Sequence, residues 1–219
     1  MSKFIIIEGP DFCGKSTQLD LLKANTWNFG KCFYFTREPG SYLPESALQC
    51  ERIRERILTN NNTPLEEAEL FAKSRYFHTK EIIKLMQEQD CVVVSDRYII
   101  SSLAYQGYAQ NLGADMIYEL NRETLNLLEE NDIEIHCIKF NIDEDEWNIR
   151  RKKRLYSEEA DSIEQKDIHS FVLDFFTNDN VFKQYTQGLN MVVHNIDASN
   201  AKLVVFMEFL GVIGRIINS

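Results

Sequence analysis

Residues 3–17 read KFIIIEGPDFCGKST, in which an isoleucine-rich run leads directly into a stretch that fills every fixed position of the pattern GxxxxGK[ST]. In such a loop the glycines let backbone N–H groups turn towards a phosphate, and the helix that follows presents the positive end of its dipole to the same anion. Residues 4–7 have the composition of a buried parallel strand, and residues 17–22 begin a helical pattern. Strand, loop and helix therefore come in the required order, which favours a nucleotide-binding site over a tight turn alone.

The predicted nucleotide-binding loop gives individual side chains a role. Lys15 is expected to reach the β- and γ-phosphates, and the Ser16 hydroxyl is expected to ligate Mg²⁺. Phe12 and Cys13 occupy variable positions of the pattern, and their side chains are interpreted as structural. The residues predicted to form the loop around the nucleotide are Gly9, Pro10, Asp11, Phe12, Cys13, Gly14, Lys15, Ser16 and Thr17.

The composition fits a single α/β domain spanning residues 1–219. No apolar stretch approaches the ~20 residues of a membrane span and no signal peptide is recognisable, so we expect a cytoplasmic protein with no membrane partner. A net charge of −10 argues against a nucleic-acid partner, although the cations at residues 150–154 leave a small anionic substrate open. Five scattered cysteines predict neither disulfides nor zinc, and the four histidines form no motif, so we expect packing or surface roles for them.

Five apolar runs alternate with segments that are long enough for helical crossovers; they lie at residues 4–7, 32–36, 91–95, 135–140 and 191–195. This alternation predicts a doubly wound five-stranded parallel sheet with helices on both faces. Thr63 and Glu66 form a capping box around Pro64, which predicts a helix that runs to about residue 87, and a core-facing helix is expected over residues 199–217.

Ligands of such sheets bind beyond the carboxyl ends of the strands, so polar residues at those ends are informative. The second predicted strand is followed by the segment TREPG at residues 36–40, and the third by DRY at residues 96–98. Asp143 and the basic run follow the fourth strand. We expect these groups to face one crevice.

In combination, the segments EGPDFCGKSTQ, TREPG, ELFAKSRYFH, SDRYIISSLAYQG and DSIEQ closely resemble the thymidylate kinase family. The resemblance covers residues 4 to about 165 and is far more specific than the loop alone. It implies the P-loop NTPase kinase fold with a short lid at about residues 143–164. It further implies transfer of the γ-phosphate of ATP to dTMP, which gives ADP and dTDP with Mg²⁺ as cofactor, in dTTP biosynthesis. Members of this family are commonly homodimers, so the resemblance also implies a homodimer.

By this resemblance Phe71 stacks on the thymine and Arg75 donates hydrogen bonds to its carbonyl edge. The spacing suits this task, because residues four apart share one face of a helix. The same spacing also fits a core phenylalanine beside a surface arginine.

The phosphate contacts implied by the resemblance begin with Arg97, which corresponds to the arginine that grips the phosphate of dTMP. Asp96 is positioned to hold Mg²⁺ directly or through water, although Asp96 and Arg97 could instead pair at a strand end. Arg37 and Glu38 of TREPG are expected near the acceptor phosphate.

The stretch SSLAYQG, which begins at Ser101, is implied to close around the deoxyribose and base. Tyr105 would help to exclude a ribose 2′-hydroxyl, and Gln106 would lie beside it, unless both are packing residues. Asp11 lies where the family has an acid between the two phosphate sites, near Mg²⁺ and the sugar, which suggests a catalytic or positioning role.

Some members of the family carry an arginine next to the position of Asp11, whereas others supply it from a mobile lid. This chain has Phe12 there, so the resemblance implies that the catalytic arginines are Arg150, Arg151 and Arg154 in the lid. A solvated basic helix face is the alternative. The lid also departs from the common pattern DRxE, because Ser162 replaces its arginine.

Two other functions remain open on these residues. A deoxynucleoside kinase would share the loop and a DR-type motif but take a nucleoside as acceptor. A catalytically silent nucleotide-binding protein would bind a triphosphate without turnover.

Overall fold

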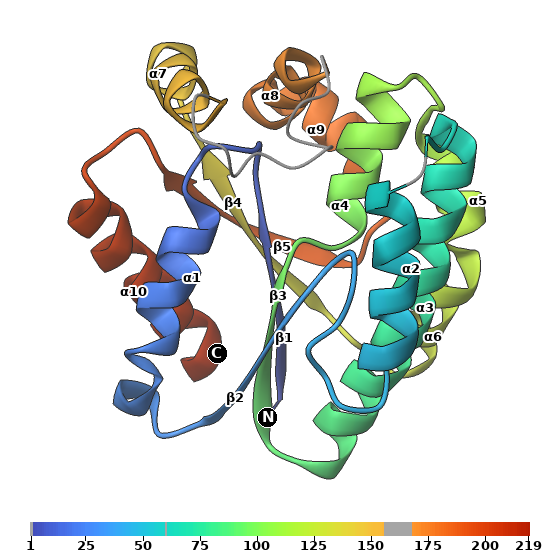
Figure 1. The fold of residues 1–219 in the computed structure, drawn as a ribbon. Helices are drawn as coiled ribbons and strands as arrows, with labels where there is room; N and C mark the ends of the chain where they lie inside the picture. Colours follow the sequence, from blue (N-terminus) through green and yellow to red (C-terminus); the bar gives the residue numbers. More distant parts are fainter. Residues whose placement is uncertain (1, 60, 156–167) are drawn as a thin grey trace.

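The computed structural model describes residues 2–59, 61–155 and 168–219, and its centre is a five-stranded parallel sheet (Figure 1). The strands are β1 (Lys3–Glu8), β2 (Cys32–Arg37), β3 (Cys91–Asp96), β4 (Ile135–Asn141) and β5 (Met191–Asp197), in the order β2-β3-β1-β4-β5. All five predicted strands are confirmed, and each extends one or two residues beyond the predicted range. In the central strand Ile5 pairs with Val94 on one side and His136 on the other.

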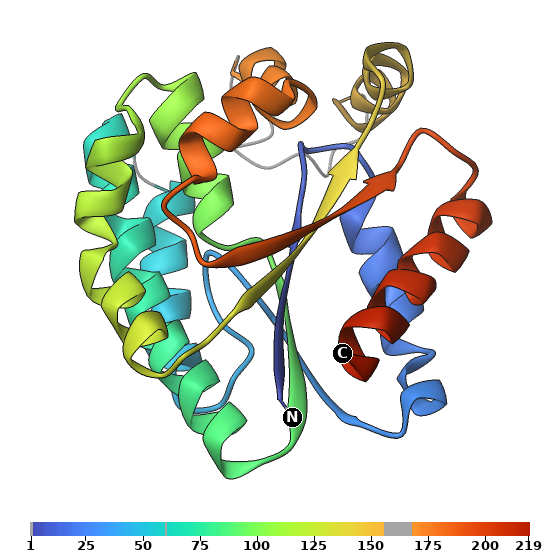
Figure 2. The ribbon, with the colours of Figure 1, turned by 180° about the vertical axis from the view of Figure 1, so that it is seen from behind.

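One face of the sheet is covered by α1 (Lys15–Lys23) and α10 (Lys202–Asn218), which lie side by side (Figures 1 and 2). Leu19 and Leu22 of α1 pack with Phe209 and Ile213 of α10 against the sheet. Because α1 starts at Lys15, packing on this face fixes the direction in which the predicted nucleotide-binding loop leaves the sheet. The short 3-10 helix η1 (Thr26–Phe29) follows α1.

The other face carries a larger group of helices, which are α2 (Ala47–Thr59), α3 (Pro64–Glu88), α4 (Ile99–Ser102), the π-helix η2 (Leu103–Ala109), α5 (Ala114–Leu120) and α6 (Arg122–Glu130). Thr63 caps α3 as predicted, because its side chain accepts a hydrogen bond from the backbone N–H of Glu66 while the Glu66 carboxylate accepts one from Thr63. Tyr98, Phe175 and Ile82 belong to the core on this face.

Within the described residues three more helices follow β4 and precede β5: α7 (Glu144–Leu155), α8 (His169–Thr177) and α9 (Asp179–Thr186). Figure 1 shows α7 and α8 beyond the carboxyl ends of the strands. The predicted lid at 143–164 therefore begins with α7, whereas its part from residue 156 onwards, with the DSIEQ segment, lies outside the described residues. Within the described ranges no helix combines the length and apolarity that a membrane crossing requires.

Candidate active site

The loop after β1 has the backbone conformation that its glycines allow. Gly9 has a φ of 150° and lies so close to β4 that a Cβ atom there would be 2.7 Å from the carbonyl oxygen of Phe140. Gly14, with a φ of 97°, is the residue at which the loop turns into α1. Lys15 Nζ donates hydrogen bonds to the carbonyl oxygens of Gly9 and Pro10, at 2.9 and 2.8 Å. The ammonium group of Lys15 therefore lies inside the loop and connects the start of α1 to the residues that follow β1.

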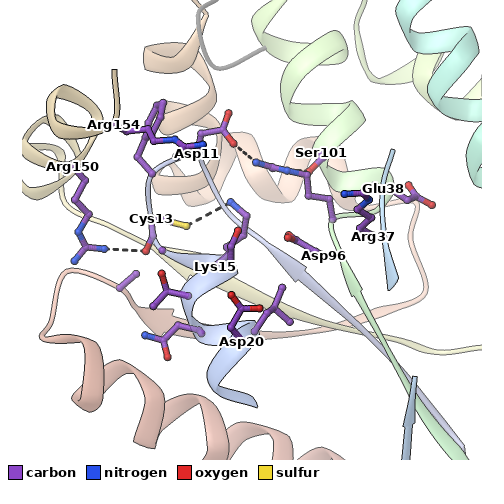
Figure 3. A pocket seen from close by; sticks show the side chains of 18 of the residues that line it. Asp11, Cys13, Lys15, Asp20, Arg37, Glu38, Asp96, Ser101, Arg150 and Arg154 are labelled. Carbon is purple, nitrogen blue, oxygen red and sulfur yellow. Dashed lines mark hydrogen bonds and ion pairs between the residues drawn. The ribbon is translucent and has the colours of Figure 1, made fainter. Parts of the chain in front are cut away.

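A cavity of about 1040 Å³ begins at this loop and lies at the carboxyl ends of the strands (Figure 3). Its size is at the upper end of the ~300–1000 Å³ of ligand pockets, which leaves space for more than one small ligand. The predicted site residues that line it are Asp11, Phe12, Cys13, Gly14, Lys15, Ser16, Thr17, Arg37, Glu38, Phe71, Asp96, Arg97, Ser101, Tyr105, Gln106, Arg150 and Arg154. Gly9, Pro10, Arg75 and Arg151 do not line it.

Asp11 is the hydrogen-bonding centre of this cavity. Its carboxylate accepts hydrogen bonds from Arg97 Nη2 and from the Tyr105 hydroxyl, and it lies 3.3 Å from Nδ1 of His169. The backbone carbonyl of Asp11 accepts a hydrogen bond from Nε1 of Trp147 in α7, at 2.9 Å. Burial would raise the pKa of Asp11, but Arg97, His169, Lys15 and Tyr105 outweigh it and hold that pKa well below its usual range. Asp11 is therefore a carboxylate at neutral pH.

Arg97 has a second set of partners at the end of β3. Its Nη1 donates to Ser101 Oγ at 3.1 Å and to the carbonyl oxygen of Gly9 at 3.4 Å, and its backbone φ is 72°, which is uncommon for a residue with a side chain. Ser101 Oγ in turn donates to Glu8 at 2.7 Å. A chain of contacts thus runs from Glu8 through Ser101 and Arg97 to Asp11.

Glu8, the last residue of β1, is fully buried beneath the cavity. It accepts hydrogen bonds from the backbone N–H groups of Tyr98 and Ser101, at 2.7 and 3.3 Å. Burial raises the pKa of Glu8 to about 7, against the opposing effects of the Ser101 hydroxyl and of Arg97. This carboxyl group therefore titrates close to neutral pH.

The far end of the cavity is formed by α3 and η2. Phe71 lines it, but the Arg75 side chain is fully buried behind it. The Arg75 guanidinium donates to Glu38 at 2.7 Å, to Asn121 at 2.6 Å and to the Ser102 hydroxyl at 3.0 Å. The predicted contact of Arg75 with thymine therefore stays a prediction.

The TREPG residues lie along another wall of the cavity. Arg37 pairs with Glu51 at 2.9 Å and lies over the ring of Tyr42, 4.3 Å from its centroid. Glu38 is bonded to Arg75 and lies 3.0 Å from Nδ1 of His78. Glu38 therefore helps to hold Arg75 in place, whereas the guanidinium of Arg37 lies at the cavity surface (Figure 3).

The side chains near the loop suit a hard cation such as Mg²⁺, which prefers oxygen ligands and keeps several waters. Asp96 Oδ1 is buried and has no hydrogen-bond partner within the described residues, and Asp96 lines the cavity together with the exposed Ser16. Asp11 is a poorer ligand as it stands, because its oxygens are engaged by Arg97 and Tyr105.

Of the three arginines of helix α7, two lie at the loop or the cavity and one packs on a tryptophan. Arg150 Nη1 donates to the carbonyl oxygen of Cys13 in the loop at 3.0 Å, and its Nε donates to Glu146 at 2.7 Å (Figure 3). Arg154 lines the cavity. Arg151 instead lies over the ring of Trp147, 5.4 Å from its centroid, away from the cavity.

Several residues of this site were not predicted. Glu8, Glu67, Gln110, Trp147 and His169 all contact predicted site residues or line the cavity. The position of Glu67, four residues before Phe71 on the same helix, is the sequence signal that could have identified it. His169 has the predicted packing role, since it is buried with its ring centroid 5.5 Å from that of Phe12, and its imidazole also lies against Asp11.

The loop between β1 and α1, the parallel sheet of order β2-β3-β1-β4-β5 and the cavity at its carboxyl end define the protein as a member of the P-loop NTPase class. The thymidylate kinase family model matches residues 7–196. The chain belongs to the thymidylate kinase family.

Individual relatives agree with this assignment. The chain is 34% identical over 216 residues to a thymidylate kinase of Bacillus velezensis, which covers 97% of this chain and 95% of the relative. It is 32% identical over 211 residues to a thymidylate kinase of Ureaplasma parvum, covering 94% of this chain and 86% of the relative. The crystal structure of thymidylate kinase from Ehrlichia chaffeensis has the same fold, with a TM-score of 0.61 at 24% identity over 97% of this chain and 98% of that chain.

Proposed function

We propose that the protein is a thymidylate kinase that transfers the γ-phosphate of ATP to dTMP, giving ADP and dTDP for dTTP biosynthesis. The observation that carries this proposal is the cavity itself, which extends from Lys15 in the loop to Phe71 on α3, with Arg97 also in its wall. Such a cavity can hold two nucleotides with their phosphates facing each other. The family assignment supplies the identity of the two substrates.

The reaction requires alignment of two anions and neutralisation of their charge, with little water present. Lys15 would leave the carbonyl oxygens of the loop and bind the β- and γ-phosphates of ATP. Arg97 would bind the phosphate of dTMP, and Asp11 would fix the orientation of that guanidinium. Because Asp11 stays ionised, it can hold Arg97 across the pH range in which the nucleotides are fully charged.

The lid arginines complete this charge pattern. Arg150 and Arg154 are the candidates of choice for the migrating phosphoryl group, since Arg150 already contacts the loop and Arg154 lines the cavity. Phe12 leaves the loop without an arginine of its own, so a cation from α7 is needed there. We assign Arg151 a packing role on Trp147 instead.

The cofactor of the reaction is Mg²⁺ in this proposal. Ser16 and Asp96 would hold it, with phosphate oxygens and waters as the remaining ligands. The cation would neutralise charge that develops on the phosphates during transfer. Asp11 would then act near the metal without ligating it.

The acceptor nucleoside would lie between α3 and η2. Phe71 would stack on the thymine, and Tyr105 with Gln106 would close around the sugar and base. The hydroxyl of Tyr105 is held by Asp11, which suits a rigid barrier against a ribose 2′-hydroxyl. Arg37 would approach the acceptor phosphate from the opposite wall.

We also propose that the enzyme is a homodimer that works in the cytoplasm. Support for the dimer comes from the family, whose members commonly pair. Support for the compartment comes from the five cysteines, which are all free thiols and fit a reducing environment. Light scattering on the purified protein tests the dimer, because a mass equal to that of one chain at micromolar concentration would contradict it.

The proposed reaction is tested by measuring ADP release with a panel of acceptors. With ATP and Mg²⁺ present, dTMP should give the highest kcat/KM among the deoxynucleoside monophosphates, and thymidine should give none. Turnover on thymidine alone would instead identify a deoxynucleoside kinase. Tight ATP binding without turnover on any acceptor would identify a silent nucleotide-binding protein.

A further inference from the structure

A buried carboxylate at the acceptor end of the cavity holds two glutamine side chains. Glu67 lies in the first turns of α3, is 2% exposed, and lines the cavity. Its Oε2 accepts a hydrogen bond from Nε2 of Gln110 at 3.1 Å and a longer one from Nε2 of Gln106 at 3.4 Å. Because Glu67 accepts both hydrogen bonds, the two amide groups turn their NH₂ ends towards it.

This arrangement decides what the two glutamines offer to a ligand. Oε1 of Gln106 and Oε1 of Gln110 are buried, and neither has a hydrogen-bond partner in the part of the chain that the structure describes. Both residues line the cavity. Buried polar atoms are nearly always bonded, so two orphaned acceptors beside a cavity indicate a ligand, or water bound with it, that donates hydrogen bonds.

The two glutamines lie in and just after a wide helical turn. Residues 103–109 form a π-helix, and the backbone N–H of Gln110 donates to the carbonyl oxygen of Tyr105, five residues earlier, at 2.9 Å. Gln106 and Gln110 are four residues apart at this wide turn and reach the same carboxylate, and such turns are often found at functional sites. The π-helix thus lies at the acceptor end of the cavity, where both glutamines bond to Glu67.

The neighbours of Glu67 connect these acceptors to the nucleobase. Phe71 follows Glu67 by one helical turn, and Tyr105 directly precedes Gln106. In the proposed function a thymine ring stacks on Phe71, and this ring would lie in the cavity that Gln106 and Gln110 also line. Thymine and uracil carry a donor N3–H, whereas N3 of cytosine is an acceptor and would meet an oxygen lone pair.

We propose that Glu67 is a specificity-determining positioning residue, which fixes Gln106 and Gln110 with their carbonyl oxygens towards the acceptor base and thereby selects a base with a donor at N3. This inference rests on the proposed function, because it assumes that a pyrimidine monophosphate lies on Phe71. Glu67 itself acts through the glutamines and need not contact the base.

The test compares Glu67→Gln with the wild type, using dTMP and dCMP as acceptors. A glutamine at position 67 can donate as well as accept, so the amides of Gln106 and Gln110 would no longer be forced into one orientation. We expect the ratio of kcat/KM for dTMP to that for dCMP to fall about tenfold, mainly through a higher KM for dTMP. The KM for ATP should stay unchanged. Glu69→Gln is the matched control, because Glu69 is exposed on the same helix.

A second variant keeps the proposal testable if Glu67→Gln folds poorly. Gln106→Met keeps the length of the side chain but removes its carbonyl acceptor, and it should lower the same selectivity ratio. In the double variant the two effects should not add, since Glu67 acts through Gln106. Additive effects, or equal losses for dTMP and dCMP, would show a merely structural role and overturn the proposal.

The outcomes also separate this inference from the proposed function. If the wild type lacks activity on dTMP, the proposed function fails. If the wild type prefers dTMP and the Glu67→Gln variant keeps the selectivity of Glu69→Gln, only the role of Glu67 is refuted.

Discussion

Replacing Asp11 with asparagine removes the charge at the hydrogen-bonding centre of the cavity. In the structure this carboxylate accepts hydrogen bonds from Arg97 and Tyr105 and lies 3.3 Å from His169. Hydrogen bonds to a charged group contribute ~1.5–3 kcal/mol each, against ~0.5–1.5 kcal/mol for neutral pairs. Neutralising the acceptor of two such bonds therefore costs about 2–3 kcal/mol, and the asparagine amide would also point a donor at Arg97 or at Tyr105.

The consequence for catalysis follows from the role proposed for Arg97. Its guanidinium would no longer be held where the acceptor phosphate arrives, so kcat/KM for dTMP should fall roughly 30- to 140-fold, at about 1.4 kcal/mol for each factor of ten. A coupled assay of ADP release measures this fall. Asp115→Asn is the control, because Asp115 is exposed at the start of α5, and its kcat/KM should match the wild type.

The two variants also need a check of folding, since Arg97 loses its ion-pair partner in Asp11→Asn. Thermal unfolding followed by circular dichroism supplies it. If Asp11→Asn is folded and keeps kcat/KM for dTMP within about threefold of the wild type, Asp11 does not orient Arg97 for the reaction, and the reasoning above is refuted.

Three further predictions concern other parts of the site. Lys15→Ala should lower kcat by at least about 10³-fold, because it removes the cation that lies against the carbonyl oxygens of Gly9 and Pro10 in the loop, and an unchanged kcat would exclude its phosphate role. Phe71→Ala should raise the KM for dTMP about tenfold and leave the KM for ATP unchanged, because it removes the ring on which the thymine stacks. If the variant and the wild type had the same KM for dTMP, the proposed acceptor site would be in the wrong place. Burial raises the pKa of Glu8 from 4.5 to about 7, so Glu8 stabilises the fold fully below pH 4.5, and this contribution, about 3 kcal/mol, is lost as pH rises to 7. The free energy of unfolding, measured with urea between pH 5 and 8, should fall with pH in the wild type but not in Glu8→Gln. The same dependence on pH in both proteins would contradict this prediction.

The strands and the loop could be predicted from sequence because each depends on neighbours in the chain. The run at 4–7 is apolar enough to be buried on both faces, and the glycine pattern after it has few alternatives. The helix from Thr63 was also predictable, since its capping box is a local signal. The order of the strands follows from the fold class rather than from any local signal.

The parts that could not be predicted depend on contacts between distant segments. Arg75 shares a helix face with Phe71, but its direction is set by Glu38 and Asn121, which come from other elements. The contact between His169 and Asp11 joins α8 to the loop, and no spacing in the sequence reports it. The π-helix at 103–109 was missed for a different reason, because its apolar residues are also compatible with an ordinary helix.

The central claim is that one cavity holds both nucleotides, with the loop around ATP and Arg97 on the phosphate of dTMP. A crystal structure with dTMP and a non-hydrolysable ATP analogue tests it most directly. The account predicts the thymine against Phe71, the dTMP phosphate on Arg97, and the triphosphate within the loop at Lys15. A thymine nucleotide bound away from Phe71 and Arg97 would contradict it.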